Sequence, residues 1–170
     1  MDSRYTLLFK KGSASTVNSY TQWGIVCAKV PFKAGGTTKE LPNRKWYDEH
    51  GDDTYIPNSL MLEGYDVEFE FAYAGKELHS NPFNLSLART NITNFKNWLT
   101  GNGTGNSGAE LKIYSPYSTI GRQGCYLKEI SNEEPSLQLR QEGSNLYHEN
   151  VVTFKVKFRV TDPMTDITLS

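Results

Sequence analysis

A strictly alternating stretch at residues 151–160 constrains the fold more than any other part of the sequence. It reads V-V-T-F-K-V-K-F-R-V, so apolar residues occupy every second position from Val152 to Val160, with Thr, Lys or Arg between them. Side chains alternate across an extended chain with a period of two, whereas a helix would scatter the same residues around its circumference. We therefore predict a β-strand with one buried and one solvated face, which Pro163 helps to end.

A second alternating stretch, residues 65–73, has the opposite charge on its polar face. Aromatic residues and Val occupy alternate positions, and Asp66, Glu68 and Glu70 lie between them. Cross-strand pairs of opposite charge stabilise neighbouring strands. The acidic stretch and the basic 151–160 stretch are thus favoured as neighbours, although alternation alone leaves their pairing open.

Length, charge and cysteine content limit the class of protein. The chain has 170 residues and a formal net charge of −1, which suits a single domain over residues 1–170 and gives no overall attraction to nucleic acid or anionic membrane. We find no apolar run of membrane-spanning length and no signal-peptide core in residues 1–19, so we expect a protein made and kept in a cytoplasm, without membrane insertion. Cys27 and Cys125 are expected to be buried thiols and not a disulfide.

Further strands and one helix complete the predicted fold. Shorter alternating runs predict strands at residues 4–10, 21–30, 110–114, 124–130 and 136–140, with a hairpin turn at residues 142–145. A helix is predicted over about residues 91–100, with a weaker extension back through Leu85, from the helical spacing of Ile92, Phe95, Trp98 and Leu99. The predicted fold class is mainly β: an antiparallel β-sandwich or barrel with one flanking α-helix.

Residues 31–59 break the alternation and are predicted to form a long loop. The segment is rich in Gly, Pro and charged residues, including an acidic run at residues 48–53 around His50. Loops of this length are usually functional or disordered, and aromatic residues argue against disorder because they need a surface to pack on. Trp46, Tyr47 and Tyr55 are therefore the candidate residues for an assembly interface.

Motifs for chemistry are weak throughout the sequence. Residues 103–108 have the spacing G-x-G-x-x-G, but a predicted helix precedes them and a predicted strand follows, the reverse of a nucleotide-binding loop. The acidic run around His50 lacks the ligand spacing of a calcium loop and is interpreted as a solvated turn. The three histidines lie in polar contexts, without a nucleophile motif. We therefore predict no catalytic, cofactor-binding or metal-binding residues.

The order of several short motifs resembles the N-terminal domain of phage distal tail proteins and, more broadly, the tail-tube-like fold of phage tails. The resemblance covers about residues 23–163 and rests on W-G-I at 23–25, G-D-D-T-Y-I-P at 51–57, Y-D-V-E-F-E-F at 65–71, F-K-N-W-L-T-G at 95–101, L-K-I-Y at 111–114, G-R-Q-G-C-Y-L at 121–127 and V-T-F-K-V-K-F at 152–158. The family's usual glycine-rich turn before the paired strand is replaced here by one rich in Asp, Glu and His. The position within a tail, as distal tail, tube or other baseplate component, is left open.

This resemblance implies a non-catalytic structural protein of a phage or prophage tail. Its subunits would assemble into a ring, expected to be a hexamer, and DNA would pass through the lumen without being read in sequence. The implied partners are copies of the chain itself and tube, tape-measure or baseplate components, in a virion tail assembled in the cytoplasm of the bacterial host. Exposed edge strands are natural points for ring closure.

A second class of function remains open from the sequence. A ligand-binding β-sandwich, for example a carbohydrate-binding domain, could use Trp46, Tyr47, Tyr55 and Tyr117 as a stacking platform. The lack of a signal peptide weighs against this class, because such modules are usually secreted.

Overall fold

The computed structural model describes the chain except for residues 1–4, 30–31, 33–35, 46, 49, 75–84, 103–107 and 143–144. The elements follow in the order β1 (Leu8–Lys10), β2 (Val17–Asn18), α1 (Ser19–Trp23), β3 (Ile25–Lys29), β4 (Asn43–Arg44), β5 (Asp53–Thr54), β6 (Tyr65–Tyr73), α2 (Leu85–Thr100), β7 (Leu111–Ser115), β8 (Ile120–Glu142) and β9 (Asn145–Val160).

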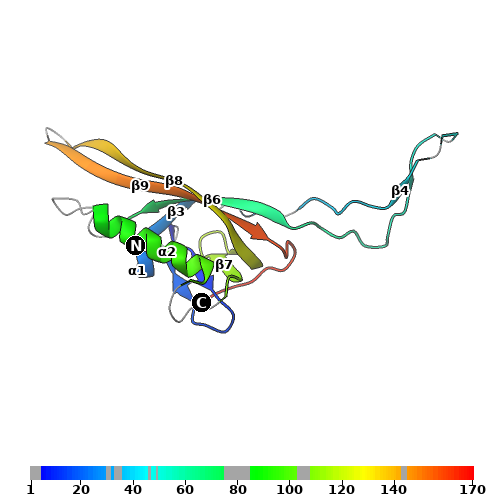
Figure 1. Ribbon diagram of the computed structural model, residues 1–170, viewed down its shortest axis with the longest axis horizontal. Helices are drawn as coiled ribbons and strands as arrows, with labels where there is room; N and C mark the ends of the chain where they lie inside the picture. Colours follow the sequence, from blue (N-terminus) through cyan, green and yellow to red (C-terminus); the bar gives the residue numbers. More distant parts are fainter. Residues whose placement is uncertain are drawn as a thin grey trace.

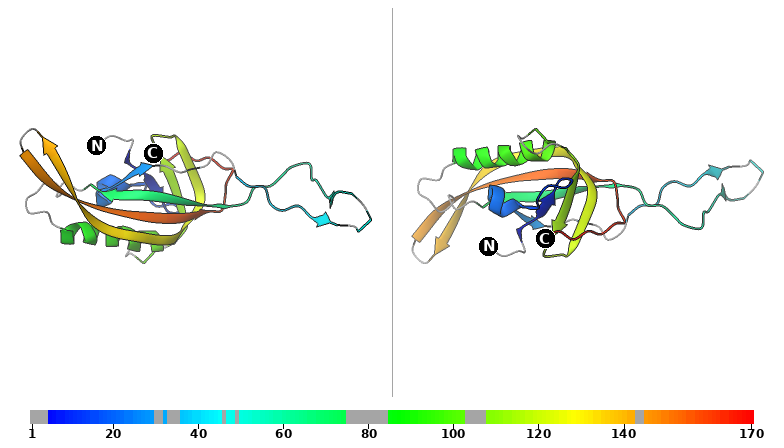
Figure 2. Two further views of the ribbon diagram at one scale, coloured as in Figure 1. Left: turned by 90° about the horizontal axis from the view of Figure 1, so that it is seen from above. Right: turned by 90° about the horizontal axis from the view of Figure 1, so that it is seen from below.

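Seven strands form one antiparallel sheet in the order β2-β1-β7-β8-β9-β6-β3, and β4 and β5 form a separate small hairpin. The sheet curls into a half-barrel, with α2 packed along one side (Figures 1 and 2). The paired ends of β8 and β9 extend beyond the rest of the sheet, on the side away from β4 (Figure 1). The predicted mainly β, antiparallel class with one main helix is confirmed, and the sheet curls on itself because strands twist.

The acidic strand β6 pairs directly with the basic part of β9, as complementary charge favoured. The register places Glu68 opposite Lys157 and Asp66 opposite Arg159. A guanidinium nitrogen of Arg159 lies 3.1 Å from an Asp66 carboxylate oxygen, and the Lys155 ammonium lies 3.3 Å from a Glu68 oxygen. On the opposite face of both strands, the alternate apolar side chains are buried in the core.

Helix α2 covers the inner face of the sheet with its apolar stripe. Ile92, Phe95 and Leu99 are buried, and the Trp98 side chain is almost so. The ring centroid of Trp23 lies 5.0 Å from that of Phe95 and 5.2 Å from that of Trp98, so α1 joins the same aromatic core. The predicted stripe is confirmed, and the helix begins at Leu85, in agreement with the extension back from residue 91.

Part of the strand predicted at residues 21–30 is helical, and that part of the prediction is wrong. Helix α1 begins after Asn18, whose side-chain oxygen accepts hydrogen bonds from the backbone amides of Tyr20 and Thr21. It ends at Gly24, whose φ of 68° is left-handed and favours glycine. Strand β3 then begins at Ile25, so capping at both ends decides the local structure over a few residues.

The two strands predicted at residues 124–130 and 136–140 are parts of the single strand β8. Pro135 lies within β8 and pairs in register with Val152 of β9, just after a shift in register between Ser131 and Glu134. Among the described pairs, β7 contacts β8 only over residues 120–125, so β8 has one neighbour at Pro135. Proline is tolerated in a strand at such an edge, because no partner needs its missing amide hydrogen.

The other sequence predictions concern the two cysteines, a hairpin turn and a glycine-rich segment. Cys27 and Cys125 are buried thiols and not a disulfide, as predicted. The hairpin turn predicted at residues 142–145 is bounded by the paired Glu142 and Asn145, and its two central residues lie outside the described part of the chain. Most of the glycine-rich segment at residues 103–108 also lies outside it. None of the described helices is long and apolar enough to cross a membrane.

Candidate functional site: a projecting arm

Residues 36–64, here called the arm, leave the sheet as two antiparallel legs and project away from it (Figure 1). At the base, Thr38 lies opposite Leu62, and the legs are joined by backbone hydrogen bonds of 2.8 Å from Lys39 to Met61 and from Glu63 to Thr37. At the far end, β4 pairs with β5. From residue 36 onward, the described residues of the predicted long loop at 31–59 therefore lie on the arm, which carries a hairpin at its far end; the hairpin was not predicted.

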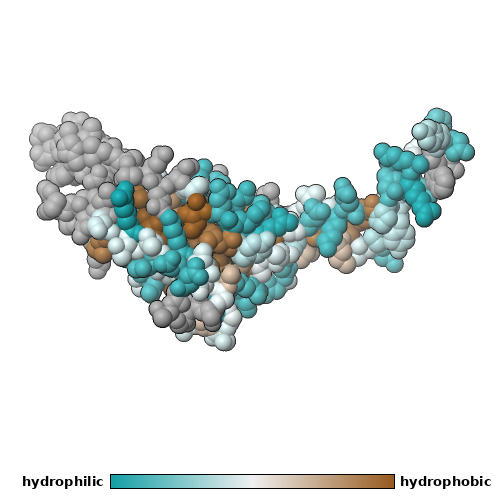
Figure 3. All heavy atoms as spheres, viewed as in Figure 1, coloured by the Kyte–Doolittle hydropathy of each residue, from teal (hydrophilic) through white to brown (hydrophobic). Residues whose placement is uncertain are grey.

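Several large apolar side chains of the arm are exposed to solvent. Ile56 keeps 72% of its surface exposed, and Met61 keeps 62%. The other members of this exposed apolar set in the arm are Tyr47, Tyr55 and Leu60. Figure 3 shows apolar atoms along the arm, interspersed with hydrophilic ones. No described arm residue belongs to the buried core cluster, so this apolar surface faces solvent in the single chain.

The structure places two of the three predicted interface residues on this arm. Tyr47 and Tyr55 are exposed there, and Trp46 lies outside the described residues. Sequence reasoning missed three of the exposed apolar residues. Leu60 and Met61 lie just beyond the predicted loop, and Ile56 lies within it but is not aromatic, which was the property used to select interface candidates. The signal available was an apolar cluster directly after the polar loop and before the alternation that begins at Tyr65.

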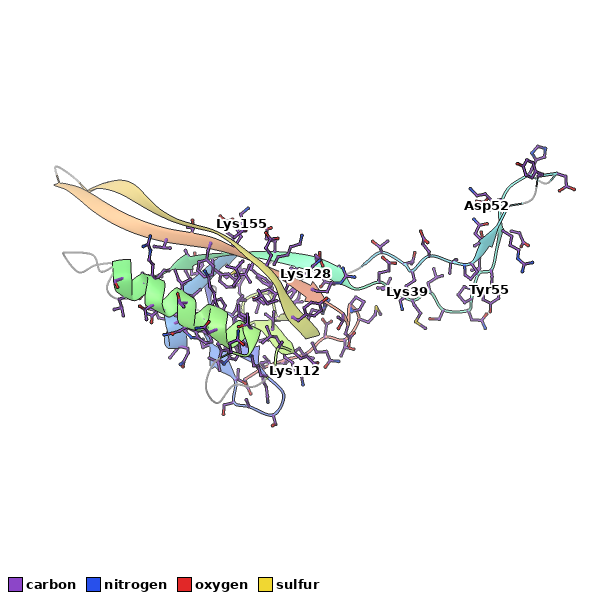
Figure 4. All side chains as sticks on the ribbon, in the orientation of Figure 1. Lys39, Asp52, Tyr55, Lys112, Lys128 and Lys155 are labelled. Atoms are coloured by element: carbon purple, nitrogen blue, oxygen red, sulfur yellow. The ribbon has the colours of Figure 1, made fainter. Side chains whose placement is uncertain are left out.

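The tip of the arm is residues 45–52, between β4 and β5, and its described residues are all exposed. Asp48, His50 and Asp52 are exposed there, and Asp53 follows at the start of β5. Within the described residues, no group of three or more His, Cys, Asp or Glu side chains is arranged to hold a metal ion. The tip presents carboxylates to solvent at the point of the molecule farthest from the sheet (Figure 4).

A close backbone contact fixes where the arm joins β6. A Cβ atom at Gly64 would lie 2.6 Å from the Val160 carbonyl oxygen and 3.3 Å from the Thr161 Cα. Cβ atoms essentially never approach a backbone oxygen so closely, so only glycine fits here without movement of the chain. The end of β9 thus sets the direction in which the arm leaves the sheet.

Two polar features of the body could in principle take part in chemistry. Buried Arg122 contacts Asp166 through an ion pair; burial alone would lower the pKa of Arg122, but Tyr65 and Asp166 outweigh it and raise the pKa. A hollow of about 390 Å³ on the outer side of α2 is lined by Ser86, Arg89, Thr90, Thr93 and Asn94. That lining holds no carboxylate and no nucleophile paired with a base, which general acid–base or covalent catalysis would need.

The four aromatic residues proposed for a stacking platform do not share one surface element. Tyr117 lies in the turn between β7 and β8, on the body of the protein, while Tyr47 and Tyr55 lie on the arm. Figure 4 shows Tyr55 towards the far end of the arm. A sugar ring stacks on side chains that lie next to one another, so this arrangement does not favour the platform.

Comparison with known proteins finds no matching family model, no similar curated protein and no similar solved structure. The function is therefore argued from the fold and from the arm.

Proposed function

We propose that the chain is a non-catalytic structural subunit that assembles with copies of itself through the arm. The observation that carries this proposal is the exposed apolar set of the arm, which lies beyond the reach of the chain's own core. Several large apolar side chains exposed together on one segment are a common mark of an interface. Fully burying side chains such as Ile56, Leu60 and Met61 would contribute about 1.5–3 kcal/mol each.

The size of the arm suits a stable interface. A standard protein–protein interface uses about 20–30 residues on each side, and residues 36–64 provide a segment of that length. Ordering such a segment costs about 1–2 kcal/mol per residue in backbone entropy. Contacts with a neighbouring subunit would offset this cost. The cost itself is lowered by the backbone hydrogen bonds that already join the two legs at their base.

The proposed assembly is a ring in the tail of a phage or prophage, with the hexamer as the expected state. Support comes from the mainly β fold with one main helix and from the order of motifs that resembles distal tail proteins. In the described part of the chain, β3 pairs only with β6 and so provides an open edge for a neighbouring copy. Tube, tape-measure or baseplate proteins would be the further partners.

The test compares two sets of substitutions that remove similar exposed apolar groups. The arm variant carries Tyr55→Ser, Ile56→Ser and Met61→Ser, and the control carries Tyr117→Ser and Met164→Ser on the body, where both side chains are more than half exposed. Light scattering against concentration and negative-stain images measure assembly. We expect rings from wild type and control, and monomers from the arm variant with an unchanged melting temperature.

Two outcomes would contradict the proposal. Wild-type protein that stays monomeric up to the highest soluble concentration, without rings in images, would remove self-assembly itself. An arm variant that assembles as well as wild type would show that the arm is not the interface. Limited proteolysis adds a second readout, because the legs should be cut in dilute monomer and protected in rings.

A further inference from the structure

Two lysines face each other at one end of the sheet. Lys10 of β1 lies directly opposite Lys112 of β7. Both side chains are partly exposed, on the face opposite to the buried Phe9 and Ile113. Within the part of the chain that the structure describes, neither ammonium group has an ion-pair or hydrogen-bond partner.

This arrangement is unfavourable in a single chain, because like charges directly opposite each other destabilise a strand pair. The contrast lies within the same sheet, where Asp66 of β6 contacts both Lys128 and Arg159 at 2.8 and 3.1 Å. There, a single carboxylate lies among several basic groups and contacts each of them. Among the described residues, no carboxylate pairs with Lys10 or Lys112, and an anionic group from another molecule would stabilise the two lysines.

The arm tip carries the complementary charge. Asp48 and Asp52 are exposed there, and among the described residues neither has an ion-pair partner. Figure 4 shows Asp52 near the far end of the arm and Lys112 on the body, with the length of the arm between them. The tip of a chain therefore does not meet the Lys10–Lys112 pair of the same chain.

We propose that the arm tip of one copy docks on the Lys10–Lys112 pair of a second copy, with Asp48 and Asp52 facing the two ammonium groups. This inference rests on the proposed self-assembly and names the receiving surface. Exposed ion pairs add little affinity individually. The charges instead fix the position of the tip and speed the encounter, while the apolar side chains of the legs provide most of the binding free energy.

This contact determines the symmetry of the assembly. The donating surface is the arm tip and the receiving surface is the β1–β7 end of the sheet, so the contact joins two different patches. Such head-to-tail contacts close into a ring when the rotation between copies permits, and otherwise continue as a filament. Each copy has one tip and one receiving pair, which fits a cyclic assembly without unpaired sites.

The experiment uses charge reversal on each side of the contact. The tip-reversed variant carries Asp48→Lys and Asp52→Lys, and the patch-reversed variant carries Lys10→Glu and Lys112→Glu. Each alone should need at least about tenfold higher concentration to assemble, because like charges now meet. An equal mixture of the two variants should assemble, and so should one chain carrying all four changes. Arg89→Glu, at an exposed site on α2, is the control and should assemble like wild type.

A neutral variant distinguishes the loss of a contact between copies from misfolding of the monomer. Lys10→Gln with Lys112→Gln removes the repulsion between the two lysines, so it should raise the melting temperature of the monomer while weakening assembly. A purely structural role for the pair would move both quantities in the same direction. Raised salt should also weaken wild-type assembly, since the screening length falls from about 8 Å at 0.15 M to about 3 Å at 1 M.

The outcomes separate this inference from the proposed function. If wild type assembles but the reversed variants assemble equally well, or if their mixture is not rescued, the receiving surface is wrong and self-assembly stands. If the neutral variant assembles like wild type, the inference is likewise overturned. If wild type does not assemble at any concentration, the proposed function itself is overturned, and this inference with it.

Discussion

The Lys11 side chain is bound to Trp98 at the C-terminal end of α2. Its ammonium group donates a hydrogen bond to the Trp98 carbonyl and lies 4.5 Å from the centroid of the Trp98 ring. Burial lowers the pKa of Lys11. A cation at a helix C-terminus interacts favourably with the helix dipole and, over an indole, with the ring face. This contact joins the residue after β1 to the last turn of the helix.

Replacing this lysine tests the contact directly. Lys11→Met keeps an unbranched side chain of similar length and removes the charged donor. We expect the free energy of unfolding, measured with urea, to fall by about 1.5–3 kcal/mol, the range for a hydrogen bond to a charged group. Lys10→Met is the matched control at the partly exposed neighbouring position and should not destabilise the protein. An equal, small effect of both substitutions would contradict the assigned role of Lys11.

Trp98 itself should be among the most costly residues to truncate. Its ring centroid lies 5.2 Å from that of Trp23 and 6.1 Å from that of Phe9, so it connects α1, α2 and β1. Trp98→Ala should lower the free energy of unfolding by about 3–5 kcal/mol through lost contacts and the cavity left behind. Tyr117→Ala, at an exposed position, should change it by less than about 0.5 kcal/mol. A thermal melt unchanged by Trp98→Ala would contradict the position of the helix.

The strongest sequence patterns predicted the fold where physical constraints agreed. Strands β6 and β9 each combine strict alternation with a face of one charge, and the complementary signs favoured the pairing that the structure shows. The stripe containing Phe95 and Trp98 predicted α2 for a similar reason, since helical spacing persisted over several turns. Both signals are long enough to dominate local preferences.

The elements that the sequence did not predict are short or depend on distant contacts. Helix α1 has five residues, too few for periodicity, and only its Asn18 cap and its Gly24 end distinguish it from a strand. The hairpin β4–β5 pairs two residues with two, so no alternation can appear. The apolar cluster around Ile56 and Met61 is visible in the sequence, but its exposure is not, because apolar residues are expected to be buried and only the path of the arm away from the core reverses this.

The thiol of Cys125 should be unreactive in the folded protein. Burial raises its pKa to about 12, and thiolate is the species that reacts with thiol reagents. Cys27 is buried as well. At pH 8, iodoacetamide followed by mass spectrometry should label neither cysteine in native protein and both in denaturant without reductant. Labelling of Cys125 at a rate typical of an exposed thiol would contradict its burial, and failure to label in denaturant would indicate a disulfide.

Asp162 should make stability depend on pH in the acid range. Its carboxylate accepts hydrogen bonds from the Gln123 side chain at 2.8 Å and from the Thr165 and Met164 amides at 3.0 and 3.2 Å. These bonds lower its pKa from 3.8 to about 2. A lowered folded-state pKa stabilises the fold above the unfolded value, and this stabilisation is lost as the pH falls from about 4 towards 2.

Substitution of Asp162 separates this contribution from general acid denaturation. In Asp162→Asn, the fall in melting temperature between pH 5 and pH 2.5 should be smaller than in wild type, because the amide does not titrate. Asp48→Asn, in the exposed arm tip, is the control and should keep the wild-type slope. Equal slopes in wild type and Asp162→Asn would show that the hydrogen bonds around Asp162 do not favour its ionised form.

The body of the protein should fold without the arm. Thr37 and Glu63 are joined by a backbone hydrogen bond of 2.8 Å, which is the pairing that closes a two-residue β-hairpin turn. Replacing residues 38–62 by Asn-Gly should therefore close the legs at their base, and the described arm residues contribute nothing to the core cluster that remains. We expect the armless chain to keep the far-ultraviolet spectrum of a β protein, to melt within a few degrees of the full chain, and to remain monomeric where the full chain forms rings.

A matched variant with the turn Gly-Ser in place of Asn-Gly controls for turn chemistry. Loss of cooperative melting in both armless variants would show that the arm is part of the folded core, and ring formation by them would place the assembly interface elsewhere.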